Sequence, residues 1–162
     1  MYTRNLLWLV SLVSAAPLYA ADVPANTPLA PQQVFRYNNH SDPGTLDPQK
    51  VEENTAAQIV LDLFEGLVWM DGEGQVQPAQ AERWEILDDG KRYIFHLRSG
   101  LQWSDGQPLT AEDFVLGWQR AVDPKTASPF AGYLAQAHIN NAAAIVAGKA
   151  DVTSLGVKAT DD

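Results

Sequence analysis

The sequence predicts a mixed fold, of the α+β or α/β class, in which helices flank a small antiparallel sheet. Apolar residues recur at three- and four-residue spacing in two separate stretches, which is the pattern of amphipathic helices. Between those stretches, short runs of aromatic and β-branched residues are separated by turns that contain Asp and Gly, as in β-hairpins. A chain of 162 residues with 46% hydrophobic content can bury one domain of ordinary size but not two.

The first residues have the pattern of a secretory signal peptide. Arg4 supplies a basic head, residues 6–16 are apolar apart from two serines, and small residues follow at Ala20 and Ala21. This apolar run is shorter than the roughly 20 residues of a membrane-spanning helix, although a retained membrane anchor is the alternative. We therefore expect a cleaved signal over residues 1–20, a mature chain starting at Ala21, and no membrane insertion after the signal is removed.

The absence of cysteine from the chain bears on its final location. A lipoprotein needs a cysteine directly after the cleavage point to carry its lipid, so an acyl anchor is not expected. Disulfides are excluded as well, although an oxidising compartment would permit them. The mature protein is therefore expected to be free in the periplasm and to be stabilised by a buried core.

An extended arm is predicted over residues 21–33, which are rich in Pro, Ala and Gln and show no period. Residues 34–37 place apolar side chains around a charge, and they predict a first strand. A helix is expected next, capped by Asn54 or Thr55 and closed by Gly66. Its apolar positions are Ile59, Val60, Leu63 and Phe64.

Three strands are predicted in the middle of the chain, at residues 67–70, 83–87 and 93–97. The segments that connect these strands carry strong turn signals, Asp-Gly at 71–72 and Asp-Asp-Gly at 88–90. We expect these strands to form an antiparallel meander with one face covered.

A second amphipathic helix is expected after Thr110, because Asp113 stands three positions on and completes a variant of the capping box. Pro124 ends this helix. A further helical region is predicted over residues 129–147, with a break near Asn140. The apolar stripe of the second helix is Phe114, Val115, Trp118 and Val122.

The charge of the chain excludes several classes of partner. Removing the predicted signal leaves 10 basic and 20 acidic residues, a formal net charge of −10. Nucleic acid is not an expected partner, because phosphates require clustered Lys and Arg. Adhesion to an anionic membrane surface is disfavoured for the same reason.

No catalytic residue, metal site or cofactor is predicted. His40, His96 and His138 lie far apart in different elements, so they form no metal-binding pattern, and His96 is expected to be structural. No serine lies in a nucleophile elbow, and no thiol is present.

Two groups of acidic residues have a pattern that could indicate a calcium site or a catalytic pair. Residues 71–82 place acids at the first, third and twelfth positions of a calcium loop, but Val76 stands where glycine is needed. A plain hairpin turn is the expected structure there. The adjacent acids Glu52 and Glu53 could suggest a glycosidase, yet neighbouring side chains seldom face each other as acid and base. We expect an acid that faces solvent or ligand instead.

One long motif carries a resemblance to a known family. Residues 103–114, WSDGQPLTAEDF, resemble the extracellular solute-binding family that contains oligopeptide-, dipeptide- and murein-peptide-binding proteins. The resemblance runs from about Val34 to the last residue. Further matching segments are FHLR at 95–98, SDPGTLDPQK at 41–50, DLFEGL at 62–67 and WQRAVDPKTASPF at 118–130.

This resemblance implies the N-terminal part of a type II periplasmic-binding-protein-like fold, in which two lobes close on a cleft and an extra domain is inserted early. Residues 34–66 would begin the first lobe, and residues 67–162 would fill most of the inserted domain and be truncated at the C-terminus. The family's proteins are several hundred residues long, so we expect this chain to be a fragment. The implied function is a monomeric periplasmic receptor, not an enzyme, that captures oligopeptides for an inner-membrane ABC permease.

The resemblance also implies ligand-binding residues: Glu52, Asn54 and Phe130 match ligand-lining positions. Such receptors hold the peptide main chain by strand-like hydrogen bonds and leave its side chains in roomy pockets. Oligopeptide binders typically carry tyrosine where this chain has Phe130, so a hydroxyl contact is missing and a murein-peptide specificity stays open. The alternative functions are a stand-alone periplasmic interaction module and a non-functional truncated product.

Overall fold

The computed structural model describes residues 26–32 and 34–160. The predicted signal peptide at 1–20, its cleavage site and the start of the predicted arm lie outside the described residues. The chain divides into two units, Met1–Tyr37 and Asn38–Asp162. The described residues of the first unit are exposed and form neither helix nor strand.

The predicted strand at residues 34–37 is wrong, because these residues are coil. Phe35 is 91% exposed, so the alternation of apolar and charged side chains does not mark a buried face. A strand is held by hydrogen bonds to a neighbouring strand, and none of the described strands pairs with this segment. The sequence pattern alone could not supply that partner.

Helix α1 spans Asn54–Leu63, which confirms the first predicted helix. Its N-cap is Glu53, not Asn54 or Thr55, and Phe64 caps the C-terminus before Gly66 is reached. The predicted apolar stripe is covered only in part: Ile59 and Val60 are half-buried, but Leu63 is 60% exposed and Phe64 46% exposed. Among the residues of α1, all of which the structure describes, Ala56 is the one that is buried.

The three predicted strands are confirmed, but they do not form one meander. The four strands are β1 (Val68–Met70), β2 (Val76–Pro78), β3 (Ala81–Leu87) and β4 (Arg92–Leu97). They make two separate antiparallel pairs, β1 with β2 and β3 with β4, so β2 was missed. The three-residue β2 is too short to show a period, and a register shift interrupts the β3–β4 pairing between Ala81 and Arg83.

Helix α2 spans Ala111–Val122, and its predicted cap is confirmed. The main-chain N–H of Thr110 donates to Asp113 Oδ2 at 2.8 Å, and the Thr110 hydroxyl donates to the same oxygen at 3.0 Å. These contacts satisfy the start of the helix, where main-chain N–H groups lack partners within the helix. The helix ends at Asp123, just before the predicted stop at Pro124.

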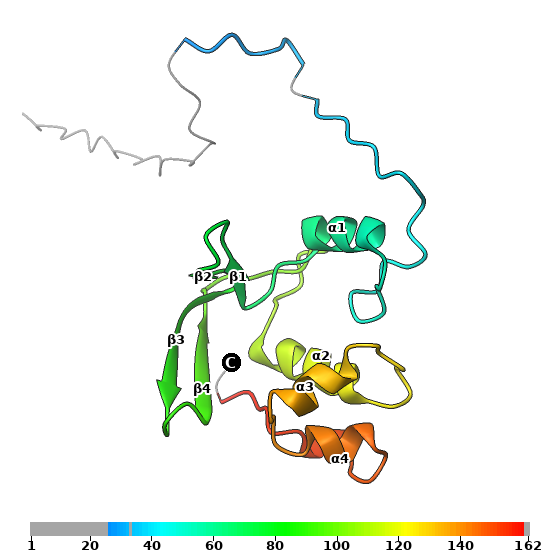
Figure 1. Cartoon of the computed structure of the whole chain (residues 1–162). Helices are drawn as coiled ribbons and strands as arrows, with labels where there is room; N and C mark the ends of the chain where they lie inside the picture. The colour runs from blue at the N-terminus through cyan, green and yellow to red at the C-terminus, as the bar shows by residue number, and fades with distance from the viewer. Residues whose placement is uncertain (1–25, 33, 161–162) are drawn as a thin grey trace, which may run out of the picture. The chain divides into compact units, whose positions relative to one another are not determined.

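The second helical region is confirmed as two short helices, α3 (Ala131–Gln136) and α4 (Ala142–Val146), followed by the 3-10 helix η1 (Val152–Ser154), which was not predicted. Asn141 breaks the region with a left-handed φ of 64°. The main core lies where α2, α3 and α4 meet (Figure 1). Its buried members are Val122, Ala142, Ile145 and Leu155, with Trp118 packed against them.

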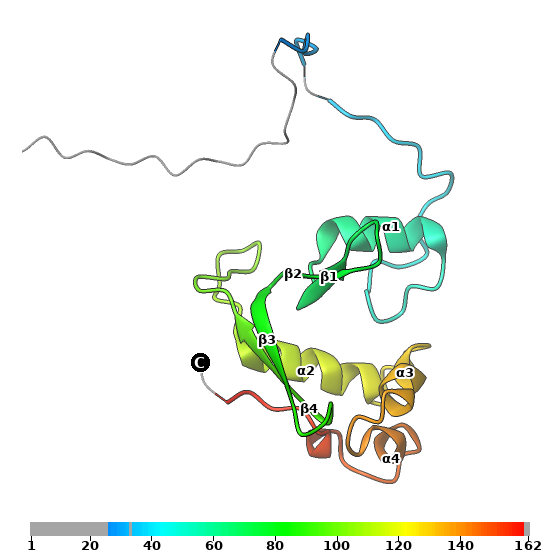
Figure 2. The same cartoon turned by 60° about the vertical axis from the view of Figure 1, so that its left-hand side comes forward.

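The β3–β4 hairpin lies beside α2 in the same unit (Figure 2). Helix α2 therefore has neighbours on two sides, the hairpin and the other helices, and its C-terminal half faces the loop that precedes α1. Across the described part of the chain, no helix has the length and apolar character needed to cross a membrane.

Candidate functional site

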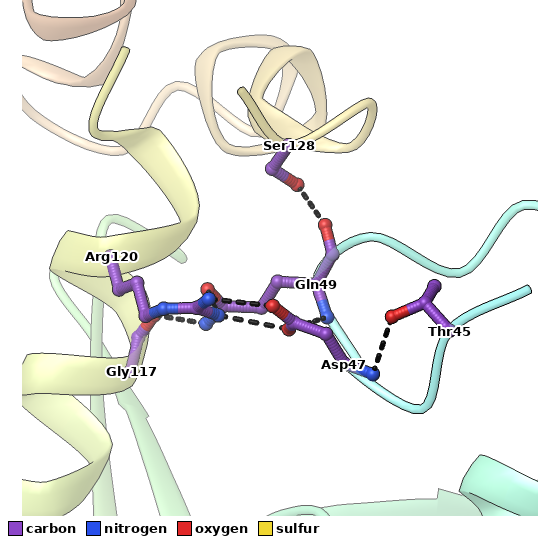
Figure 3. A network of polar contacts seen from close by, with 6 residues as sticks. All are labelled: Thr45, Asp47, Gln49, Gly117, Arg120 and Ser128. Atoms are coloured by element: carbon purple, nitrogen blue, oxygen red, sulfur yellow. Dashed lines mark hydrogen bonds and ion pairs between the residues drawn. The ribbon is translucent and has the colours of Figure 1, made fainter. Parts of the chain in front are cut away.

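A set of polar contacts joins the loop before α1 to helix α2 (Figure 3). Arg120, in the last turn of α2, donates from Nη1 to Asp47 Oδ1 at 2.9 Å and from Nη2 to Asp47 Oδ2 at 2.6 Å. Two parallel bonds of this kind fix the orientation of both groups as well as their distance. We call the whole set the polar junction; it consists of Asp47, Gln49, Gly117, Arg120 and Ser128.

Gln49 lies at the centre of the polar junction and uses all of its polar groups. Its side chain accepts from Arg120 Nη1 at 2.7 Å and donates to the main-chain oxygen of Gly117 at 2.6 Å. Its main-chain oxygen accepts from Ser128 Oγ at 2.7 Å, and its main-chain N–H donates to Asp47 Oδ1 at 3.1 Å. One residue thus ties the loop to α2 and to the loop before α3.

The loop has a local reason to present Asp47 in this way. The main-chain N–H of Asp47 donates to Thr45 Oγ1 at 3.1 Å, and that of Lys50 donates to the main-chain oxygen of Asp47 at 2.9 Å. Side chains such as Thr and Asp commonly close turns through bonds of this kind. Val51, which is 6% exposed, then anchors the end of the loop in the interior.

Asp47 and Arg120 each shift the pKa of the other. The hydrogen bond from Arg120 lowers the pKa of Asp47 from its ordinary value of 3.8 to about 2, with partial burial opposing the shift. The hydrogen bond to Asp47 in turn raises the pKa of Arg120. The Arg120 side chain is 46% exposed and that of Asp47 25%, so solvent screens much of this attraction.

The predicted ligand-binding residues lie around the polar junction. The main-chain N–H of Phe130 donates to Ser128 Oγ at 3.2 Å, and the same hydroxyl donates to Gln49, so Phe130 is two bonds from the loop. Glu52 follows Gln49 by three residues, a span of at most roughly 11 Å. Glu52 and Asn54 are exposed, and Phe130 is 37% exposed with its ring 6.2 Å from that of Tyr133.

These three residues are exposed and do not line an enclosed pocket. A hollow of about 780 Å³ lies between β4 and α2, and a second lies between the end of α1 and β1. Glu52, Asn54 and Phe130 line neither of them. The surface can therefore contact a ligand from one side, but in this chain it does not surround one.

Two further predictions concern acids and histidine. The plain hairpin turn is confirmed, because the Asp71 carboxylate accepts from the main-chain N–H groups of Glu73 and Gln75 at 3.0 and 2.8 Å. These bonds lower the pKa of Asp71, the Gln75 bond being the largest cause.

His96 lies on β4 with Nε2 2.7 Å from Glu85 Oε1 on β3, a cross-strand contact that fits the structural role predicted for it. Within residues 26–32 and 34–160, no three His, Asp or Glu side chains are grouped as metal ligands.

The polar junction itself was not predicted from the sequence. All of its members except Gly117 lie in two segments, 41–50 and 118–130, that each match the family motifs. The signal in the sequence is weak, because both segments carry charges of both signs: Asp42, Asp47 and Lys50 in the first, and Arg120, Asp123 and Lys125 in the second. Pairing Asp47 with Arg120 required a separation of 73 positions to be bridged, which no local pattern indicates.

One family of binding proteins matches this chain in sequence. The family model described as "Bacterial extracellular solute-binding proteins, family 5 Middle" matches residues 75–162. The chain therefore belongs to the bacterial extracellular solute-binding proteins, family 5, which confirms the resemblance inferred from the motifs. The family is one of solute-binding proteins and not of enzymes.

Individual relatives agree with the family match. The chain is 99% identical, over its whole length, to a protein of Escherichia coli strain K12 named "Probable deoxycholate-binding periplasmic protein YgiS". It is 50% identical, over 95% of its length, to the periplasmic oligopeptide-binding protein OppA of Salmonella typhimurium. The chain spans 30% of the length of the first relative and 28% of the second.

A solved structure supports the predicted fold class. The complex of Haemophilus influenzae OppA with the peptide RPPGFSPFR matches with a TM-score of 0.74 and 46% sequence identity. The match covers 77% of this chain and 24% of that one. The predicted N-terminal part of a periplasmic-binding-protein fold, with its small antiparallel sheets and flanking helices, is thereby confirmed.

Proposed function

We propose that this chain is the N-terminal part of a periplasmic receptor that captures a solute and delivers it to an inner-membrane ABC importer. The observation that carries the proposal is the exposure of Glu52, Asn54 and Phe130, which can form one wall of a ligand cleft; Phe130 is joined through Ser128 to Gln49 of the polar junction. The opposite wall would come from a second lobe. In this arrangement residues 34–66 begin the first lobe, and residues 67–162 belong to an inserted domain.

The location is part of the same proposal. The relatives named above are periplasmic proteins by name, which supports a periplasmic site of action. The basic head and short apolar run at residues 1–20 would serve as the cleaved export signal. Such a receptor would act as a monomer, since its cleft is formed by two lobes of one chain.

We propose deoxycholate as the solute. At 99% identity over 162 residues, this chain differs from the protein named for deoxycholate binding at no more than about two positions. Deoxycholate is a rigid apolar ring system with hydroxyl groups and one carboxylate. The exposed ring of Phe130 offers an apolar surface to such a ligand, and the carboxylate of Glu52 can accept hydrogen bonds from its hydroxyl groups.

An oligopeptide is the second candidate solute, as the sequence motifs first suggested. The 50% identical relative is named an oligopeptide-binding protein, and the matching solved structure contains a peptide. Here Glu52 would pair with a basic side chain of the peptide, and Phe130 would contact an apolar one. The two candidates differ in the effect expected of Glu52→Gln: this change removes the charge that attracts a basic peptide, but it keeps an oxygen that can accept a hydrogen bond from a deoxycholate hydroxyl group.

The test is a calorimetric titration of a protein of the relatives' length that begins with these residues. We expect saturable binding of deoxycholate below its micelle concentration and roughly tenfold weaker binding by the Phe130→Ala variant. Glu73→Gln, an exposed acid in the β1–β2 turn, is the control and should change nothing. If the protein prefers tri- to pentapeptides, the second candidate is correct. If it binds neither ligand, the receptor proposal fails.

The remaining alternatives, a stand-alone interaction module or a truncated product, make a different prediction about the gene. Sequencing the DNA past the codon for Asp162 shows whether an open frame continues into a second lobe. A stop codon at that point would favour these alternatives over the receptor.

A further inference from the structure

We propose that Arg120 is a positioning residue: through Asp47 and Gln49 it sets where Glu52 and Asn54 stand relative to Phe130. The inference rests on the proposed function, because these three side chains are proposed ligand contacts. Arg120 itself is not assigned a contact with the ligand.

The first step of the argument is that Arg120 is carried by a rigid support. Helix α2 is capped at its start and buried on one side through Val115 and Val122, which are 8% and 0% exposed. Arg120 lies between these two anchors. Its guanidinium group therefore reaches the loop before α1 from an element that is itself fixed by the core.

The second step is that the loop depends on this contact. Residues 43–48 form no helix or strand, and residues 48–50 form a turn followed by the buried Val51. Arg120 contacts the loop at two side chains, Asp47 and Gln49, while the Ser128 hydroxyl holds the main chain of Gln49. Removing the guanidinium group would free the Asp47 side chain and leave the loop tied to its neighbours through Gln49 alone, by the bonds to Gly117 and Ser128.

The third step is that orientation, more than stability, is what Arg120 supplies. An ion pair with this much exposure contributes little to the free energy of folding. A forked pair of bonds nevertheless excludes rotation of the loop about a single contact, and lysine, with one point of charge, cannot reproduce it. Loss of Arg120 should therefore change the position of Glu52 clearly while lowering the melting temperature only slightly.

The chain contains no cysteine, so pairs of introduced cysteines can be labelled cleanly. We would place nitroxide labels at Glu52→Cys and Phe130→Cys in this 162-residue chain and measure their distance distribution by pulsed electron spin resonance. With Arg120 present a single narrow distribution is expected. Arg120→Gln should broaden it by about twofold, and Arg120→Lys should give an intermediate width. Arg83→Gln, which removes an exposed ion pair with Glu85 on β3, is the matched control.

The second measurement uses unlabelled protein of the relatives' length and its ligand. Arg120→Gln should weaken ligand binding by roughly tenfold, and Arg120→Lys should restore part of the loss. An unchanged distance distribution in Arg120→Gln overturns the positioning role whatever the ligand. A broadened distribution with no ligand bound by the wild-type protein would sustain the positioning role and reject the proposed function. If Arg120→Gln does not fold, Arg120→Lys decides: a width equal to wild type rejects the proposal, and an increased width supports it.

Discussion

Arg120 holds both carboxylate oxygens of Asp47 across 73 positions of the chain, at 2.9 and 2.6 Å. The contact closes a long loop of chain, so its two partners come together only when α2 and the segment before α1 are both in place. Its contribution can therefore be followed through the titration of one carboxyl group.

Acid should weaken the contact within a defined range of pH. The pKa of Asp47 is lowered from 3.8 to about 2 in the folded protein, so the stabilisation is present above pH 3.8 and is lost as pH falls towards 2. Because the pair is partly exposed, we expect about 1 kcal/mol. Urea unfolding of wild type and Asp47→Asn between pH 6 and pH 2 should show a difference in stability that shrinks as the pH falls. A difference that stays constant across this range would contradict the assignment.

Two glycines should respond oppositely to alanine. An added Cβ at Gly156 would lie 2.5 Å from the Cβ of Asn140 and 3.2 Å from its main chain, so Gly156→Ala should destabilise the chain by about 1 to 3 kcal/mol. Gly117 lies inside α2, and a Cβ there meets nothing within 4 Å. Gly117→Ala should therefore stabilise the helix by up to about 1 kcal/mol. Thermal unfolding of both variants checks the prediction, and equal effects would contradict it.

Trp118 should be the most important member of the α2 stripe. It is half-buried and packs against the core of Val122, Ala142, Ile145 and Leu155. Trp118→Ala should cost about 3 kcal/mol, at the lower end of the range for large aromatic residues because the ring is not fully buried. Leu116→Ala, on the exposed side of the same helix, should cost well under about 1 kcal/mol. Similar melting temperatures for Trp118→Ala and wild type would show that the stripe is not packed.

The 162-residue chain alone should bind ligand weakly. Its proposed contacts face solvent on one open surface, where an exposed polar contact contributes about 0 to 1 kcal/mol. Such contacts barely offset the freedom that a ligand loses on binding, so the dissociation constant should be no lower than roughly 1 mM. Calorimetric titration with deoxycholate and with mixed tri- to pentapeptides tests this. Micromolar binding would mean that these residues build a complete pocket.

Export without lipid should be visible at the N-terminus. Mass spectrometry of the periplasmic fraction is expected to find a mature chain that starts at or within about two residues of Ala21, since small residues mark the cleavage site. A membrane-bound product that retains Met1 would contradict the predicted signal.

Local patterns predicted the elements whose cause is local. The start of α2 was predicted because Thr110 and Asp113 satisfy each other within one turn of helix. The β3–β4 hairpin was predicted because its turn residues lie directly between its strands. In both cases the residues that determine the structure lie within a few positions of each other in the sequence.

The predictions that were wrong or absent concern features that depend on residues far apart in the sequence. Residues 34–37 carry a strand pattern but meet no partner strand among the described residues, and the α1 stripe at Leu63 and Phe64 is not covered. Both patterns indicate only that these side chains are apolar enough to be buried; they do not indicate which other segment would cover them. The polar junction depends on residues in two separate motifs, so motif resemblance marked its segments without pairing them. The ligand-binding role of Glu52, Asn54 and Phe130 stays a prediction.

The complete pairing of Gln49 restricts how this protein can change in length. A residue inserted or deleted between Thr45 and Val51 would shift Gln49 out of line with Gly117, Arg120 and Ser128 together, which no single compensating substitution can repair. The side-chain contacts of the β1–β2 turn all lie between Asp71 and Gln77, so a change in its length disturbs no contact with another element. Natural relatives should therefore differ in length at that turn and keep the spacing of the loop before α1, and aligned chains that vary freely at 45–51 would refute this.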